Sequence, residues 1–196
     1  STLNAGAIEV GPNGFLGGTG TIVGAVTNFG IVAPGASPGT LTIDGSFVNA
    51  GGGRIFLEVE ADGRGGFNTD ELIFAQGSSI DLNGAEIRFQ FLSGTDPNAF
   101  QANGKFDIDT FMKQMTSAGA IPLDHSEYAG TTFSAQSDAF IFQTFAFNPA
   151  TGATFVAVPI PEPSQWILMA AGALFILGVT RRRWQQATGE RQISFA

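Results

Sequence analysis

Glycine-bounded runs of apolar residues constrain what this chain can fold into. Most of the 27 glycines lie in the first hundred positions, and short runs rich in β-branched residues separate them, at 8–10, 21–26, 31–33, 41–43 and 55–59. None exceeds about six residues, which is too short for a helix and typical of strands joined by tight turns. The pattern predicts an all-β fold.

An Asn-x-Gly turn recurs before three of these runs, beginning at Asn4, Asn28 and Asn49. The turns are 24 and 21 residues apart, which is the length of a solenoid repeat. In a solenoid each turn of the chain buries its apolar side only by stacking on its neighbours. We therefore predict a β-solenoid-like piece over residues 1–60, at the start of an extracellular β domain over residues 1–160.

Longer strands are expected in residues 61–160, merging into an antiparallel β-sandwich or sheet. The segments 55–60 and 87–91 alternate apolar and polar residues, as in strands with one face in the core. Segment 140–147 is apolar on both faces, so it should be central or covered by a partner, and 148–152 should turn into a last strand. The sequence also predicts a strand at 105–111, a short helix at 111–118 and a loop at 119–135.

Charge is divided unevenly along the chain. Residues 1–160 carry 15 acidic and 5 basic side chains, a net charge of −10, whereas residues 161–196 carry 2 acidic and 4 basic ones. The acidic part should repel nucleic acid, and its basic residues form no binding stripe: Arg54, Arg64, Arg88, Lys105 and Lys113. No cysteine is present, which excludes disulfides and thiolate chemistry. Because the chain starts at Ser1 without methionine, we expect a mature sequence whose leader has been removed.

Residues 161–184 have the features of a transmembrane helix. From 166 to 179 there is no charge and no proline, and the large apolar side chains include Trp166, Leu168, Leu174, Phe175 and Leu177. At about 1.5 Å per residue this stretch spans roughly 21 Å, so flanking residues must help it cross a hydrocarbon core of about 30 Å. Arg181, Arg182 and Arg183 follow, and positive residues beside a span stay cytoplasmic. The alternative is a C-terminal core helix of a globular protein.

These features together resemble the PEP-CTERM sorting signal of Gram-negative bacteria. Pro161-Glu162-Pro163-Ser164 comes first, the apolar segment with Gly172 and Gly178 follows, and the three arginines come next, before a polar tail at 185–196. The resemblance implies export through the inner membrane, recognition near Pro-Glu-Pro by the membrane-embedded transpeptidase exosortase, and delivery to the cell surface or to an exopolysaccharide matrix such as that of a biofilm. Segment 32–41 also resembles a motif of autotransporter passengers and PEP-CTERM proteins.

No residue is predicted to be catalytic. His125 is the sole histidine, and its neighbours Asp124 and Ser126 cannot form a triad with it, because triad members meet through the fold. Asp107 and Asp109, with Lys105, are the local candidates for an enzyme acting on exopolysaccharide.

The segment 62–71 contains the candidate calcium ligands Asp62 and Asp70 among glycines. It lacks the EF-hand spacing, so an acidic hairpin loop is the preferred interpretation.

The features predict a non-catalytic, exported structural protein of the cell surface or extracellular matrix, anchored in the inner membrane before processing and able to form filaments as a homopolymer. Expected partners are exosortase, other copies of the chain, exopolysaccharide and the membrane; no cofactor and no nucleic acid are expected. The alternatives are an exopolysaccharide-modifying enzyme and a glycan-binding module that uses exposed phenylalanines.

Overall fold

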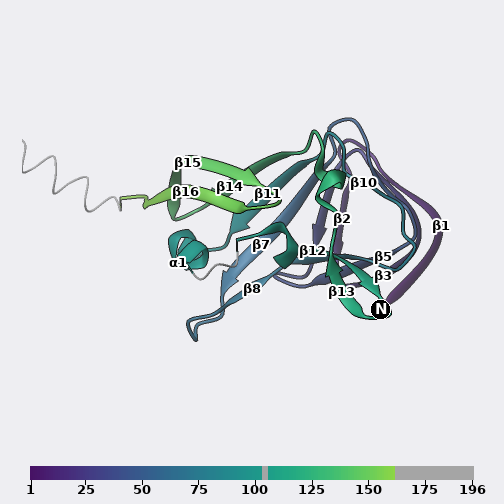
Figure 1. The fold of residues 1–196 in the computed structure, drawn as a ribbon, viewed down its shortest axis with the longest axis horizontal. Helices are drawn as coiled ribbons and strands as arrows, with labels where there is room; N and C mark the ends of the chain where they lie inside the picture. Colours follow the sequence, from purple (N-terminus) through teal and green to yellow (C-terminus); the bar gives the residue numbers. More distant parts are fainter. Residues whose placement is uncertain (103–105, 162–196) are drawn as a thin grey trace, which may run out of the picture. The chain divides into compact units, whose positions relative to one another are not determined.

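Strands make up most of the chain that the computed structural model describes, residues 1–102 and 106–161 (Figure 1). The strands are β1 (Thr2–Val10), β2 (Phe15–Gly18), β3 (Gly20–Asn28), β4 (Ile31–Pro34), β5 (Thr40–Asp44), β6 (Phe47–Asn49), β7 (Arg54–Ala61), β8 (Phe67–Thr69), β9 (Glu71–Phe74), β10 (Ile80–Asp81), β11 (Glu86–Phe91), β12 (Met112–Thr116), β13 (Gly119–Pro122), β14 (Thr132–Ser137), β15 (Phe140–Asn148) and β16 (Gly152–Pro159). The helices are α1 (Pro97–Ala102), η1 (Ile108–Thr110) and η2 (His125–Tyr128). The all-β prediction is confirmed.

Most strands belong to two sheets that the chain visits in turn. The first sheet has the order β10-β6-β3-β5-β9-β12-β13, with β1 also paired to β3, and the second has the order β14-β11-β7-β4-β2, with β8 paired to β7. In the first sheet β3 pairs in parallel with β1, β5 and β6. In the second sheet β7 pairs in parallel with β4 and β11, and β11 with β14. Successive visits to a sheet therefore lie side by side and run in the same direction.

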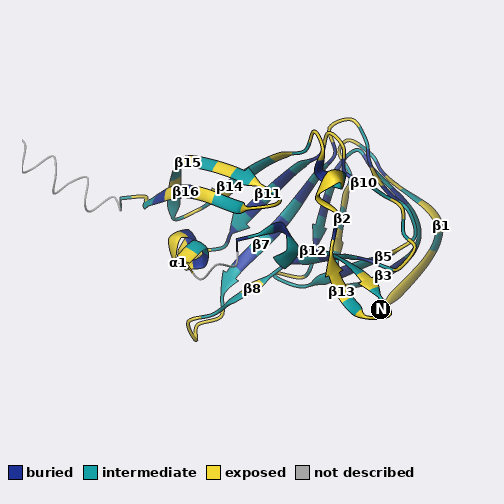
Figure 2. Ribbon diagram, in the orientation of Figure 1, coloured by how far each residue is buried: buried dark blue, intermediate teal, exposed yellow. Residues whose placement is uncertain are grey.

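The core consists of inward-facing side chains aligned in columns across these strands. Every second residue of β7 and β11 is buried, which Figure 2 shows as dark bands across the strands. In the second sheet Val32, Ile55 and Ile87 are in register, and in the first sheet Leu41 is in register with Leu72. Parallel pairing thus places apolar residues beside apolar residues from one strand to the next.

Two buried asparagines form a polar column where β3 and β6 end. Asn28 and Asn49 are in register, and Asn28 Nδ2 donates hydrogen bonds to Asn49 Oδ1 (2.9 Å) and to the Arg54 carbonyl (3.2 Å). Asn28 Oδ1 accepts from the Gly30 N–H (3.0 Å), and Asn49 Nδ2 donates to the Gly53 carbonyl (3.1 Å). The two amides therefore satisfy backbone groups of the turns that burial would otherwise leave unpaired.

The Asn-x-Gly turn predicted at Asn4 is not equivalent to the turns at Asn28 and Asn49. Asn4 is an exposed residue inside β1, in register with Val23. Val10 is the residue of β1 that lies beside Asn28. The prediction of a turn at Asn4 was wrong, because recurrence of a short motif does not establish that its copies stack on one another.

A C-terminal antiparallel hairpin, β15 and β16, packs on the core. Asn148 pairs with Gly152, which confirms the turn predicted at 148–152. An irregularity between Phe142 and Thr144 shifts the alternation of β15, so Phe142 and Phe147 both pack against the core while Ile141 is exposed. Segment 140–147 is therefore a member of a two-stranded sheet, not the central strand predicted as one possibility.

Three local predictions in the second half of the chain were wrong. The helix predicted at 111–118 is the strand β12, because Met112 pairs in parallel with Leu72 of β9 and this pairing overrides local helix preference. The described part of the strand predicted at 105–111 contains the short helix η1, and the loop predicted at 119–135 contains β13, η2 and the start of β14.

The prediction of antiparallel pairing in residues 61–160 holds only for hairpins. The pairs β7–β8, β12–β13 and β15–β16 are antiparallel, whereas β11 pairs in parallel on both sides. Alternation of apolar and polar residues shows that one face of a strand is buried, but parallel and antiparallel strands have the same alternation. The sequence pattern therefore could not distinguish them.

We expect Asn28→Ala to lower the free energy of unfolding by about 2–4 kcal/mol, because it leaves the Gly30 N–H, the Arg54 carbonyl and Asn49 without their partners in the interior. Urea unfolding followed by circular dichroism measures this change. Asn4→Ala is the matched control, since Asn4 is exposed, and it should change stability by less than about 0.5 kcal/mol. Equal losses for the two variants would contradict the assignment of the asparagine column.

Candidate functional site

Three strands of the second sheet present polar side chains in register on their outward face. In β7 and β11 the buried residues alternate with outward ones, and β14 continues the rows at the edge of the sheet. The rows are Arg54, Glu86 and Thr132; Phe56, Arg88 and Ser134; and Glu58, Gln90 and Gln136. We refer to these nine residues as the outer face.

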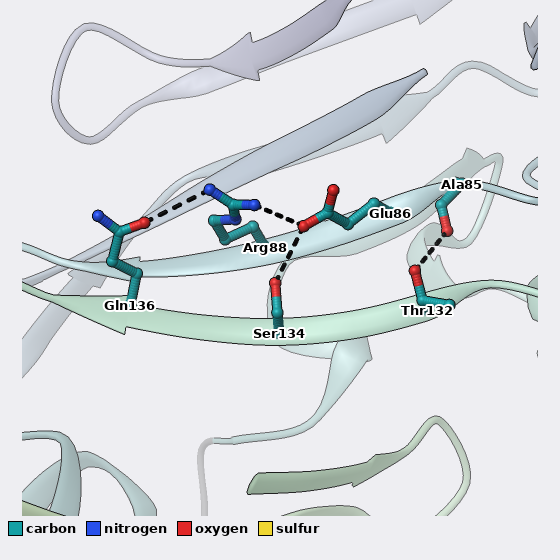
Figure 3. A network of polar contacts seen from close by, with 6 residues as sticks. All are labelled: Ala85, Glu86, Arg88, Thr132, Ser134 and Gln136. Atoms are coloured by element: carbon teal, nitrogen blue, oxygen red, sulfur yellow. Dashed lines mark hydrogen bonds and ion pairs between the residues drawn. The ribbon is translucent and has the colours of Figure 1, made fainter. Parts of the chain in front are cut away.

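Arg88 is the middle residue of the middle row of the outer face. Figure 3 shows its side chain between those of Glu86 and Gln136. Its guanidinium forms an ion pair with Glu86 (Nη2 to Oε1, 2.6 Å) and donates a longer bond to Gln136 Oε1 (3.4 Å). Glu86 Oε1 also accepts a hydrogen bond from the Ser134 hydroxyl (3.3 Å). The network therefore joins two neighbouring strands through side chains that remain partly accessible to solvent.

An aromatic ring completes the outer face. The guanidinium carbons of Arg54 and Arg88 lie 5.9 and 5.1 Å from the centre of the Phe56 ring, within the range of cation–π attraction. The face thus combines N–H donors, carboxylate and hydroxyl acceptors and an apolar ring. This mixture suits a ligand with many hydroxyl groups and apolar C–H faces, such as a sugar chain.

Sequence reasoning missed the outer face because its basic residues looked scattered. Arg54 and Arg88 are 34 positions apart, yet β7 and β11 are in register and bring both side chains over Phe56. The usable signal was the matching alternation in segments 55–60 and 87–91. Its outward positions become neighbours only when the two strands are known to be adjacent.

The two candidate calcium ligands, Asp62 and Asp70, accept hydrogen bonds from different sets of backbone N–H groups. Asp62 lies in the exposed loop between β7 and β8, where its Oδ1 accepts from the N–H groups of Arg64 (2.7 Å) and Gly66 (2.8 Å). Pairing of β7 with β8 confirms the preferred interpretation of this segment as a hairpin. Among residues 1–102 and 106–161, no group of three or more His, Asp or Glu side chains is placed to hold a metal ion.

Asp70 is fully buried and links separate segments of the backbone. Its Oδ1 accepts from the Gly39 N–H (2.8 Å), just before β5 of the first sheet, and its Oδ2 accepts from the Glu58 N–H (3.0 Å) in β7 of the second sheet. Burial raises the pKa of Asp70 to about 6, although the two N–H donors favour the ionised form. The raised pKa has a structural cause and does not by itself indicate catalysis.

The other candidate side chains also have structural surroundings. Asp107 caps η1, since its Oδ1 accepts from the Thr110 N–H (2.8 Å) and hydroxyl (2.7 Å). His125 Nε2 lies 3.6 Å from Asp109 Oδ1. Burial raises the pKa of the Tyr128 hydroxyl, with a further contribution from Asp109, so this phenol stays protonated. Asp107 caps η1 and Asp109 lies inside it, so neither is on the strand predicted at 105–111, and Lys105 lies outside the described residues.

A cavity of about 230 Å³ lies beside Asp107, lined also by Gln101, Phe106 and residues 151–153. It is smaller than typical ligand pockets of about 300–1,000 Å³. Asp107 is the single charged side chain among these lining residues, and its Oδ1 is already bonded to Thr110. The cavity therefore offers no pair of free carboxylates for glycoside hydrolysis.

The residues of the predicted sorting signal lie almost entirely beyond the part of the chain that the structure describes. Pro161 is described and follows β16, whereas Glu162, Pro163, Ser164, the apolar segment and the three arginines are outside. Within residues 1–102 and 106–161 no helix is long and apolar enough to cross a membrane.

Comparison of the chain with protein-family models, with curated proteins and with solved structures finds no match in any of the three. Inferences about function therefore rest on the residues themselves.

The free energy of unfolding should depend on pH through Asp70. A carboxyl group whose pKa is raised on folding stabilises the fold below its unfolded pKa, near 4, and this contribution is lost as the pH rises through about 6. We expect the stability difference between the wild type and Asp70→Asn to shift by about 2–3 kcal/mol against the wild type between pH 4 and pH 7. Urea titrations across this range measure it, and a constant difference would contradict the raised pKa.

Proposed function

We propose that this protein is a non-catalytic structural protein, exported to the cell surface or extracellular matrix of a Gram-negative bacterium. The observation that carries the proposal is the order of three features at 161–183: Pro-Glu-Pro-Ser, an uncharged apolar segment and three arginines. Because this segment resembles the PEP-CTERM signal, we propose that it anchors the chain in the inner membrane until exosortase acts on it. Residues 1–160 then lie outside the cytoplasm.

The arrangement of the strands supports a structural role. We interpret residues 1–60 as a β-solenoid whose parallel pairing continues through β11 and β14, because the chain alternates between two sheets and each visit stacks on the previous one. Each strand of such a stack is stabilised by its contacts with the neighbouring strands.

The strand β1 pairs only with β3 among the described strands, so its other edge offers unpaired backbone groups to another copy, which supports self-assembly.

The bonding of the acidic side chains supports a non-catalytic role. Asp62, Asp70 and Asp107 all accept hydrogen bonds from backbone N–H groups that they cap or join. Carboxylates in these positions fix the backbone and are not free to act as a general acid and base.

A second candidate function is binding of exopolysaccharide on the outer face. The observation that favours it is the Phe56 ring, which has two guanidinium groups 5.9 and 5.1 Å from its centre and lies beside the hydroxyl, amide and carboxylate side chains of β11 and β14. Both functions are compatible in one matrix protein, since assembly and glycan binding would use different surfaces.

The sorting proposal is tested by the triple substitution of Pro161, Glu162 and Pro163 by alanine. We expect the wild-type protein taken from the surface of its native cells to have an intact mass ending near Pro163, and the variant to retain Ala196 in the inner membrane. Arg191→Ala, in the polar tail, is the matched control and should be processed like the wild type. Surface material that retains Ala196, or equal delivery of the triple variant, would contradict the proposal.

The glycan-binding candidate is tested by Phe56→Ala. Loss of an aromatic ring that stacks on sugars should weaken retention in affinity electrophoresis through exopolysaccharide from the same cells, by roughly 2- to 10-fold in dissociation constant. Ile121→Ala, which removes an exposed apolar side chain of β13, is the control and should leave retention unchanged. Unchanged retention of Phe56→Ala would remove the outer face as a glycan site.

A further inference from the structure

The strand β1 is a long sheet edge with a partner on one side only. It pairs with β3 along nearly its whole length, and no other strand of the described residues pairs with it. Figure 2 shows it as largely exposed at one side of the molecule. The far edge of the first sheet is different: β13 is short, runs antiparallel to β12 and ends at Pro122, which has no N–H to donate.

The strand β1 carries no lysine, no proline and no inward-pointing charge, although it does contain the register shift between Asn4 and Ala7. Natural edge strands carry lysine, proline or inward-pointing charges that prevent pairing. In β1 the single charged side chain is Glu9, and Glu9 is also the single charged side chain of residues 1–43. Residues 44–160 carry the remaining 14 acidic and 5 basic side chains. A second copy is therefore repelled least at this end of the domain.

Apolar side chains at the same end remain uncovered. Leu3 is 53% exposed and Phe15, at the start of β2, is 68% exposed. Leu3 also lines a shallow pocket of about 130 Å³ together with Leu16 and Leu41. Residues 1–18, which contain β1 and β2, are close in number to the roughly 20–30 residues that each partner contributes to a standard interface.

We propose that two copies of this chain join through antiparallel pairing of their β1 strands, across a two-fold axis between Ala5 and Gly6. In this register Thr2 lies opposite Glu9 of the second copy, Leu3 opposite Ile8, and Asn4 opposite Ala7. The inference deepens the proposed self-assembly and rests on it, because it names the surface and the symmetry of the contact.

The irregularity in β1 selects this register. The carbonyls of Ser1 and Val10 accept hydrogen bonds from the N–H groups of Thr21 and Phe29, on the β3 side. Successive residues of a strand direct their N–H and C=O groups to opposite sides. Counting from Ser1 and from Val10, the backbone groups of Thr2, Asn4, Ala7 and Glu9 therefore face the free edge. The register shift between Asn4 and Ala7 accounts for the change from even to odd positions.

The same shift makes the strand self-complementary. Leu3 and Ile8 are in register with the buried Ile22 and Val26, so both turn their side chains inward although one position is odd and the other even. Residues opposite each other in an antiparallel pair share a face. The proposed register therefore places Leu3 against Ile8 on the inner face, which an uninterrupted strand could not do.

Charge and symmetry agree with a closed dimer. The two Glu9 side chains end up roughly 20 Å apart along the paired strands, about twice the screening length at physiological salt. A two-fold contact uses the same surface on both copies, so no free copy of that surface remains. The expected assembly through β1 is therefore a dimer and not an open filament.

A single cysteine tests the contact in the full-length protein purified in detergent, because the chain contains no cysteine of its own. In the proposed register the two Gly6 Cα atoms lie roughly 6 Å apart, within disulfide range. Gly6→Cys meets no neighbouring atom within 4 Å, and the matched control Gly51→Cys, in the turn before β7, meets none either. We expect oxidation to give a covalent dimer on a non-reducing gel for Gly6→Cys but not for Gly51→Cys.

A charge pair tests the register. Thr2→Glu places one like charge opposite Glu9 in each of the two symmetry-related pairs and should raise the dimer dissociation constant by roughly 2- to 30-fold, whereas Thr2→Lys should lower it or leave it unchanged. Sedimentation velocity on the full chain measures both, and the C-terminal tail is identical in the two variants. Cooperative loss of circular dichroism on heating checks that each variant is folded.

Each result decides a separate question. A wild type that assembles while Gly6→Cys fails to cross-link and the Thr2 variants behave alike would overturn this contact and leave the proposed structural role standing. A wild type that is monomeric at every concentration would overturn both the contact and self-assembly. Hydrogen-exchange protection of the edge-facing amides of Asn4, Ala7 and Glu9 in such a monomer would mean that another segment or protein covers β1, which also overturns the proposal.

Discussion

Parallel, in-register pairing between successive visits of the chain to the same sheet is the constraint on which this β domain depends. Such pairing brings equivalent positions into contact, so each inward column must be chemically uniform. Leu41 lies beside Leu72, and Asn28 lies beside Asn49, where the paired amides complete each other's hydrogen bonds. Glycine obeys the same rule: a side chain at Gly45 would run into the backbone of Gly24 in the neighbouring strand. A single mismatched residue therefore affects two neighbours at once.

Local order was readable from the sequence, whereas the direction and partners of the strands were not. Short glycine-bounded runs predicted strands correctly, because tight turns need glycine and leave no room for a helix. Asn28 and Asn49 were recognised as equivalent, but Asn4 shared their motif without sharing their column. The strand β12 was mistaken for a helix because its stabilising contact, Met112 beside Leu72, joins residues 40 positions apart. Local propensity carries no information about such a contact.

The candidate sites show the same limit. Asp70 attracted attention as a calcium ligand because acidic residues among glycines suit a cation loop. Its actual bonds go to the N–H groups of Gly39 and Glu58, 31 and 12 residues away, where it joins the two sheets. Arg54 and Arg88 were dismissed as scattered for the same reason, since only the pairing of β7 with β11 brings them to one ring. Residue type was therefore informative about chemistry, and topology decided its use.

The separation of charge along the chain is compatible with the self-assembly that we propose. An exposed edge strand is a hazard when copies can meet in any orientation, because unpaired backbone groups accept any extended chain. Here residues 44–160 carry a net charge of −9, which opposes most encounters, while residues 1–43 carry a single acidic side chain. Repulsion is weakest when two copies approach with their β1 ends together. In the dimer that we propose, the acidic surface disfavours the other orientations. The register shift within β1 then selects the arrangement that buries Leu3 against Ile8 of the second copy.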